Sequence, residues 1–129
     1  MTTQLERRQA AFDKVWMHFI VEGSQFGTVV VDGVRHCRLR GDDGSKCAIG
    51  VLIPDEVYVP SMEKWSLINL VGTVPELNPD DHLFYVLMRA AHDHSSRHGG
   101  LSVLRAQLEH VAREEGLTIP KRETTNSAV

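Results

Sequence analysis

The sequence predicts an α+β domain in which a small antiparallel sheet, built around a central β-hairpin, is packed by an N-terminal helix and two C-terminal helices. Apolar residues recur at helical spacing near both ends of the chain, whereas residues 28–53 form short β-type runs between turn residues. A chain of 129 residues, 42% of them hydrophobic, can bury one substantial core. We therefore expect one domain over residues 1–119 and a polar, flexible tail over residues 120–129.

The N-terminal helix is expected to start after Thr3, because Thr3 and Glu6 have the spacing of a capping box. Gly23 is a natural end for this helix, since a helix C-terminus often needs a left-handed residue. The apolar residues of this segment recur at intervals of three and four, and they are Leu5, Phe12, Val15, Trp16, Phe19 and Ile20. One face of the helix should therefore pack on the core.

Residues 28–53 are expected to form the sheet. A short strand over residues 29–31 ends at Asp32-Gly33, a hairpin-type turn pair. Beyond it, residues 34–40 and 45–53 flank Gly41-Asp42-Asp43-Gly44, whose composition suits a three-residue hairpin turn with a bulge. The predicted register pairs residue 40 with residue 46 and residue 39 with residue 47, which makes this hairpin the centre of the sheet.

Side chains alternate across a strand, so this register separates an apolar face from a basic face. The apolar face collects Cys37, Leu39, Cys47, Ile49 and Val51. The opposite face collects His36, Arg38, Arg40, Lys46, Ala48 and Gly50. We take His36, Arg38, Arg40 and Lys46 as the candidate binding site, because arginine forks hold phosphates and carboxylates. The alternative is a solvated strand face whose charges are balanced by nearby aspartates.

The two cysteines are interpreted as buried structural thiols, and neither a cofactor nor a metal is expected. Two alternatives stay open. Histidines could complete a zinc site with Cys37 and Cys47, although the spacing matches no recognised zinc motif. Cys47 could instead be a nucleophile, because the adjacent Lys46 would lower its pKa.

Between Pro54 and Pro79 prolines interrupt the chain, and only single turns or short helices are expected there. Asp80 is the expected cap of a helix whose apolar residues are Leu83, Phe84, Leu87, Met88 and Ala91. Gly99-Gly100 separates it from a helix that ends at Gly116 and carries Leu101, Leu104, Leu108, Val111 and Ala112. The short connection predicts an antiparallel helix pair.

Three histidines near the end of the first of these helices invite a metal or acid–base interpretation. On a helix His94 and His98 share a face, whereas His92 points elsewhere. The H-E-x-x-H motif of zinc hydrolases is absent, so we expect these histidines to complement the negative end of the helix dipole. The sequence also contains no phosphate loop, nucleophile elbow or dinucleotide fingerprint.

The charge distribution limits the classes of partner. A net charge of −3 disfavours indiscriminate nucleic-acid binding, which needs many phosphate contacts. This total hides four Lys/Arg against two Asp in residues 35–46, followed by six acidic residues against one lysine in residues 47–81. No apolar run is long enough for a membrane helix, and two cysteines do not suggest a secreted disulfide scaffold. We expect a cytoplasmic protein, and the open edges of a small sheet permit homo-oligomers.

The block Asp43-Gly44-Ser45-Lys46-Cys47-Ala48-Ile49-Gly50-Val51-Leu52-Ile53-Pro54-Asp55-Glu56 resembles a group of small uncharacterised proteins of tailed phages and prophages. These proteins share the pattern D-G-x-K-C-A-I-G-x-L-I-P-D-E. The resemblance implies an accessory protein in a bacterial host cell, and small proteins of that kind often act by binding, including inhibition of host defence.

The sequence thus favours a non-catalytic protein that binds a host protein or an anionic small molecule. One alternative is a small enzyme that depends on a cysteine or histidine, with or without zinc. Another is a nucleic-acid-binding regulator, for which the basic face would be the contact surface.

Overall fold

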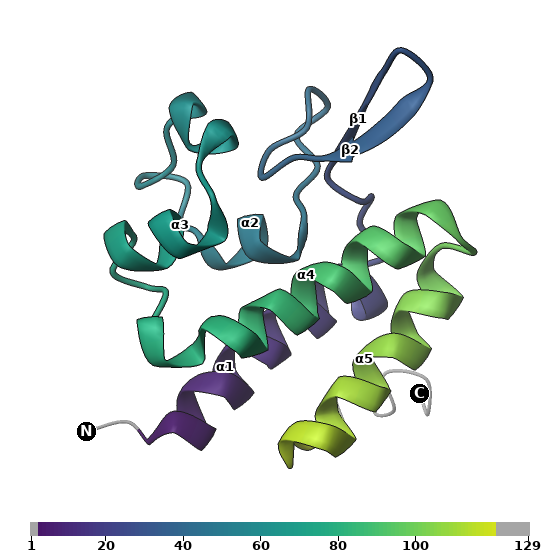
Figure 1. Cartoon of the computed structure of the whole chain (residues 1–129). Coiled ribbons are helices and arrows are strands. Elements are labelled where there is room, and N and C mark those ends of the chain that lie inside the picture. The colour runs from purple at the N-terminus through teal and green to yellow at the C-terminus, as the bar shows by residue number, and fades with distance from the viewer. Residues whose placement is uncertain (1–2, 121–129) are drawn as a thin grey trace.

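The structure is a computed structural model that describes residues 3–120, and its α+β architecture is shown in Figure 1. Helices form most of it, and the described residues contain one two-stranded antiparallel sheet. The predicted fold class is therefore confirmed, although the sheet is smaller than expected. The tail over residues 121–129 lies outside the described residues. Within residues 3–120 no helix has the length and apolar character to cross a membrane.

Helix α1 spans Gln4–Trp16 and continues as a π-helical turn, η1, over Met17–Val21. The predicted capping box is present: the Glu6 amide donates to Thr3 Oγ1 (3.1 Å) and the Thr3 amide donates to Glu6 Oε1 (2.9 Å). Gly23 follows with a left-handed φ of 69°. The buried residues of this segment are Phe12, Val15, Trp16 and Phe19. Leu5, also expected on the apolar face, is exposed because it belongs to the first turn, which lies at the end of the molecule (Figure 1).

Strands β1 (Thr28–Val31) and β2 (Val34–Cys37) form the hairpin, with Val31 paired to Val34. The turn pair Asp32-Gly33 connects them, as predicted, and both residues have positive φ. This conformation matches the right-handed twist of the strands. The hairpin extends from one end of the helical body (Figure 1), and Val30 and Val34 are more than half exposed.

The prediction of a second hairpin over residues 34–40 and 45–53 is wrong. Its turn does form, since the Gly41 amide donates to the Ser45 carbonyl (2.8 Å) and Gly44 is left-handed. After Ser45 the chain leaves the hairpin path: Lys46 bridges Phe26 in a parallel sense, and Ala48–Leu52 form helix α2. A short apolar run has no period that separates a buried strand from a buried helix, and here capping by Cys47 favours the helix.

The proline-rich middle of the chain forms the 3-10 turn η2 (Pro60–Lys64) and the short helix α3 (Leu67–Thr73). A further 3-10 turn, η3 (Pro79–Asp81), leads into helix α4 (His82–Arg97). The expected cap Asp80 is replaced by Asn78, whose side chain accepts the Asp80 amide (2.9 Å). Asp81, directly before α4, provides no side-chain cap because its buried carboxylate binds Arg7 and Arg8 of α1.

Helices α4 and α5 (Leu101–Glu115) form the predicted antiparallel pair, which Figure 1 shows crossing α1. Gly99-Gly100 separates them, and the left-handed Gly116 ends α5. The hydrophobic core lies between these helices and α2, and α3 closes one side of it. In this core, α4 packs against α2, the helix that Cys47 caps.

Candidate functional site

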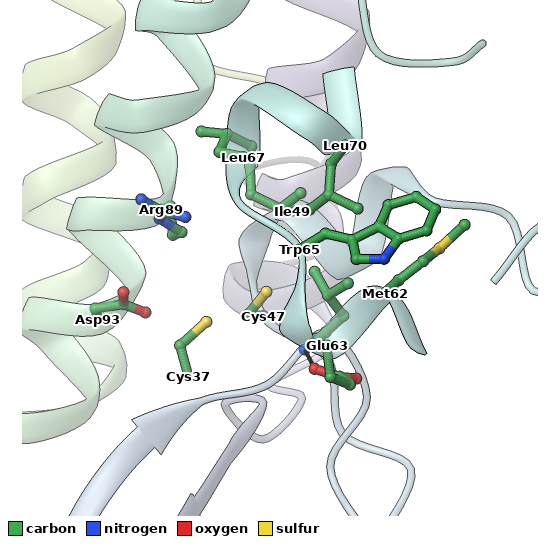
Figure 2. Close-up of a pocket in the computed structure, with 11 residues that line it drawn as sticks. Cys37, Cys47, Ile49, Met62, Glu63, Trp65, Leu67, Leu70, Arg89 and Asp93 are labelled. Carbon is green, nitrogen blue, oxygen red and sulfur yellow. Dashed lines mark hydrogen bonds between the residues drawn. The ribbon is translucent and has the colours of Figure 1, made fainter. Parts of the chain in front are cut away.

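A pocket of about 220 Å³ lies between α4 on one side and the end of β2, α2, η2 and α3 on the other (Figure 2). Its apolar lining consists of Leu39, Ile49, Met62, Trp65, Leu67 and Leu70. Its polar lining consists of Cys37, Cys47, Glu63, Arg89 and Asp93. The pocket therefore places both cysteines of the chain beside charged groups from two other elements.

Gly27 explains how the two cysteines come together. Its amide donates to the Lys46 carbonyl (2.9 Å), and its carbonyl accepts the Arg38 amide (2.8 Å). The Cys47 amide in turn donates to the Arg38 carbonyl (3.2 Å). A Cβ atom on Gly27 would lie 2.2 Å from the Cys47 nitrogen, so only glycine permits this approach. Three backbone segments therefore meet at Gly27 and hold the residues after Cys37 against those around Cys47.

Cys47 is fully buried and caps α2, where its Sγ accepts the Gly50 amide (3.3 Å). A Cβ atom on Gly50 would lie 2.2 Å from the Leu39 carbonyl oxygen, so glycine is needed for α2 to pack this closely. A hydrogen bond from Cys37 lowers the pKa of Cys47, and the amides of Gly50 and Ile49 lower it further against the effect of burial. Cys47 is thus the thiol of the pair that ionises more readily.

Cys37, at the end of β2, is half-buried. Its hydrogen bond to Cys47 raises its pKa above the ordinary range of a thiol, and burial and Asp93 raise it further. Figure 2 shows Cys37 between Cys47 and Asp93, with the two sulfur atoms close to one another. Cys47 is buried, as predicted, whereas Cys37 is only half-buried, and both face a pocket that Asp93 also lines.

His92 and Asp93 come from α4 and complete this cluster. His92 is fully buried against the rings of Phe19 and Phe26. Its Nε2 accepts the Gly27 N–H (3.2 Å), which that amide shares with the Lys46 carbonyl (2.9 Å). The His92 proton is then assigned to Nδ1, which lies 2.8 Å from Asp93 Oδ1. His92 thereby fixes the orientation of the Asp93 carboxylate beside Cys37.

Arg89 lies one helical turn before Asp93 on α4 and is half-buried at the pocket. In the part of the chain that the structure describes, its guanidinium has neither an ion-pair partner nor a hydrogen-bond acceptor. The lining also holds two carboxylates. Asp93 binds His92, and Glu63 accepts the amides of Leu39 and Arg40 and the Tyr58 hydroxyl. Arg89 is therefore the cation that the pocket offers to a ligand.

The four residues of the predicted basic site have different surroundings in the structure. His36 is exposed on β2 opposite Val29. Arg38 approaches Glu63 (3.4 Å), and Lys46 approaches Asp55 (3.4 Å). These residues do not form one strand face, because Lys46 lies beyond the sheet.

Arg40 is the most extensively bound of the predicted site residues. Its guanidinium donates to the carbonyls of Gly50 (2.7 Å) and Ile53 (2.8 Å) and to Asp55 Oδ1 (2.9 Å). It also lies over the Tyr58 ring, 4.8 Å from the centroid. The acidic segment that follows in the sequence is thus an internal partner of the basic residues, and Arg40 acts mainly as a structural link.

The remaining predicted histidines lie apart from this cluster. His94 and His98 share a face, as predicted, with ring centroids 4.9 Å apart. Sequence reasoning missed the combination of Cys37, His92 and Asp93. A signal was available: His92 follows Met88 by four residues, which places it on the buried stripe of α4 rather than at its exposed end.

Comparisons with known proteins yield no match: no family model, no curated protein and no solved structure is similar to this chain.

Proposed function

We propose that this chain is a phage-type accessory protein that acts by binding a small anionic molecule in the pocket between α3 and α4. The resemblance of residues 43–56 to small phage and prophage proteins supports the accessory role. Sequestration of such a molecule is the route by which we propose that it inhibits host defence. The pocket replaces the basic strand face as the proposed site, because the arginines of that face already have internal partners.

The observation that carries this proposal is Arg89, a cation without an internal partner among residues 3–120, beside an apolar lining. Binding pockets commonly combine an apolar lining with a few polar groups that orient the ligand. A volume of about 220 Å³ is below the range typical of drug-sized ligands, which favours a small carboxylate or phosphate with a short apolar body. Trp65 and Leu70 would contact that apolar body, while Arg89 would bind the anionic group.

The test is an NMR titration with benzoate, compared with the neutral isostere benzamide. Benzoate should shift the indole N–H signal of Trp65, which lines the pocket, and leave that of Trp16, which is buried between Phe12 and Arg105. Benzamide should bind at least tenfold more weakly. Arg89→Met should remove the preference for benzoate, Arg89→Lys should retain part of it, and Arg113→Met, a change on the exposed side of α5, should have no effect. Equal binding of benzoate to wild type and Arg89→Met would contradict the proposal.

A further inference from the structure

The cysteine pair, His92 and Asp93 form a cluster whose chemistry differs from that of the rest of the pocket. One ligand atom from each of Cys37, His92 and Asp93 lies within 4.8 Å of the others, and this is the one such group of three among residues 3–120. Cys47 adds a second sulfur, which interacts directly with the first. Of these four side chains, Cys37, Cys47 and Asp93 line the pocket, and His92 contacts Asp93.

We propose that Cys37, Cys47 and Asp93 bind a zinc ion, that His92 positions the Asp93 carboxylate, and that a fourth coordination position faces the pocket. Zinc binds cysteine sulfur at about 2.3 Å and carboxylate oxygen at about 2.0–2.2 Å, usually with tetrahedral geometry. Ligand atoms around such an ion are roughly 3.3–3.8 Å apart by that geometry. The ligand atoms of Cys37, His92 and Asp93 lie within 4.8 Å of one another, and Cys47 lies outside that group although its sulfur interacts with Cys37. Side-chain rotations, above all of Cys47, would therefore bring the three proposed ligands to the metal.

The hydrogen bonds of His92 assign it a positioning role. Its Nε2 accepts the Gly27 amide, and its Nδ1 proton binds Asp93 Oδ1. A direct bond from Nδ1 to the metal would require the proton to move to Nε2. There it would point at the N–H of Gly27, and the hydrogen bond between these two groups would be lost. Carboxylates that coordinate a metal are themselves held by hydrogen bonds from outer residues, and His92 takes that role for Asp93. The protein therefore supplies three ligands rather than four.

The surroundings of the two sulfur atoms favour zinc over a harder cation. Thiolates select soft or borderline ions, whereas Mg²⁺ and Ca²⁺ prefer sites made entirely of oxygen. The Gly50 amide donates to Cys47 Sγ, which stabilises a coordinated thiolate. Two thiolates and one carboxylate would leave a complex with a net charge of −1 around Zn²⁺. Arg89, one turn away on α4, lies on the side of the pocket where it can offset that charge.

Three protein ligands and an open position distinguish this site from a closed structural zinc site. The open position faces the pocket in which we place the anionic ligand, so a carboxylate or phosphate could occupy it. The zinc inference goes beyond the proposed function, because zinc can bind whether or not Arg89 holds a ligand. Failure of the benzoate titration would therefore leave the zinc site intact, and failure of zinc binding would leave the role of Arg89 intact.

The decisive experiment is a zinc titration of the full chain, produced without a histidine tag and stripped of metal under reducing conditions. In competition with a chromophoric chelator, the wild type should bind one zinc ion per chain. Cys37→Ser, Cys47→Ser and Asp93→Asn should each weaken zinc binding by more than 100-fold. His92→Gln, which changes an outer partner, should weaken it by about 10–100-fold. The matched control His94→Gln alters the exposed His94–His98 pair and should leave affinity unchanged.

Two measurements on the wild type avoid dependence on variants that fold poorly. Cobalt should produce thiolate-to-metal charge-transfer absorption, and zinc should slow alkylation of the half-buried Cys37 by N-ethylmaleimide. A cobalt spectrum without thiolate absorption would overturn the proposal, as would unchanged alkylation at saturating zinc. A disulfide between the two cysteines in protein purified with reductant would also overturn it, because it would remove both sulfur ligands.

Discussion

Two groups of side chains from residues 37–47 reach different electrostatic states. Cys37, Leu39 and Cys47 face the pocket, whereas Arg38, Arg40 and Lys46 face Glu63 and Asp55. In the second group each cation has an acidic partner. In the first group, the two thiols lie at the pocket together with the Asp93 carboxylate of α4.

This difference separates structure from function within one short stretch of chain. A network whose cations are paired with internal carboxylates holds the fold together and has less charge to offer a partner. A cluster of buried donors beside a pocket retains binding capacity, which is why the proposed site lies on the cysteine side. The two groups should therefore respond differently to mutation: the network through stability, the cluster through ligand affinity.

Loss of Glu63 should give the largest effect on stability. Glu63→Ala leaves the amides of Leu39 and Arg40 and the Tyr58 hydroxyl without their acceptor in a mostly buried position. We expect the free energy of unfolding to fall by about 3 kcal/mol, measured by urea denaturation followed by tryptophan fluorescence. Glu56→Ala, on the exposed surface, should change it by no more than about 0.5 kcal/mol. A loss of less than about 1 kcal/mol for Glu63→Ala would show that the network is not structural.

Zinc should stabilise the protein through the cluster alone. At a free zinc concentration 100 times the Kd, the free energy of unfolding should rise by about 2.7 kcal/mol in the wild type. Cys47→Ser should lose this increment, because it removes one of the sulfur ligands. A network variant such as Arg40→Lys should retain it in full. Equal stabilisation of wild type and Cys47→Ser in parallel urea titrations would show that zinc binds elsewhere.

Replacement of Arg40 by lysine should have an intermediate effect. A lysine ammonium cannot reach the carbonyls of Gly50 and Ile53 and the Asp55 carboxylate at once, whereas the arginine fork contacts all three. We expect Arg40→Lys to lower the free energy of unfolding by about 1–2 kcal/mol. Arg113→Lys is the matched control on the exposed side of α5. If both substitutions had the same small effect, the hydrogen bonds of Arg40 would contribute little to the free energy of unfolding.

Acid should weaken the network slightly through Asp55. Hydrogen bonding and attraction by Lys46, and then by Arg40, lower the pKa of this exposed carboxylate below its ordinary value. A depressed folded-state pKa adds stability above the unfolded pKa, about 3.9, and that stability is lost as pH falls through the folded value. Unfolding free energies measured from pH 6 to pH 3 should therefore show a small advantage of wild type over Asp55→Asn that shrinks below about pH 4. A constant difference across this range would contradict the assignment.

Local sequence signals predicted several elements correctly. The capping box of Thr3 and Glu6, the Asp32-Gly33 turn and the helix ending at Gly116 all form as predicted. These features depend on residues close in sequence, so their physical causes were visible there.

The candidate site could not be predicted in the same way, because its parts come from distant segments. Residues 45–53 alternate like a strand but form α2, since Cys47 can cap a helix and Gly50 fits against Leu39. The acidic residues after the basic stretch suggested a surface for an external partner, but Asp55 and Glu63 fold back onto the arginines.

The sequence by itself determined the α+β class, the Asp32-Gly33 turn and the helix boundaries set by the Thr3–Glu6 capping box and by Gly116. Only the tertiary structure decided which charges neutralise one another and which side chains surround the pocket. The physical reason is that helix capping and turn formation depend on neighbours a few residues away, whereas the approach of His92 to Gly27 and of Asp93 to Cys37 depends on how α4 packs. That packing places Asp93 and Arg89 beside the two cysteines, which is why they form a candidate zinc site.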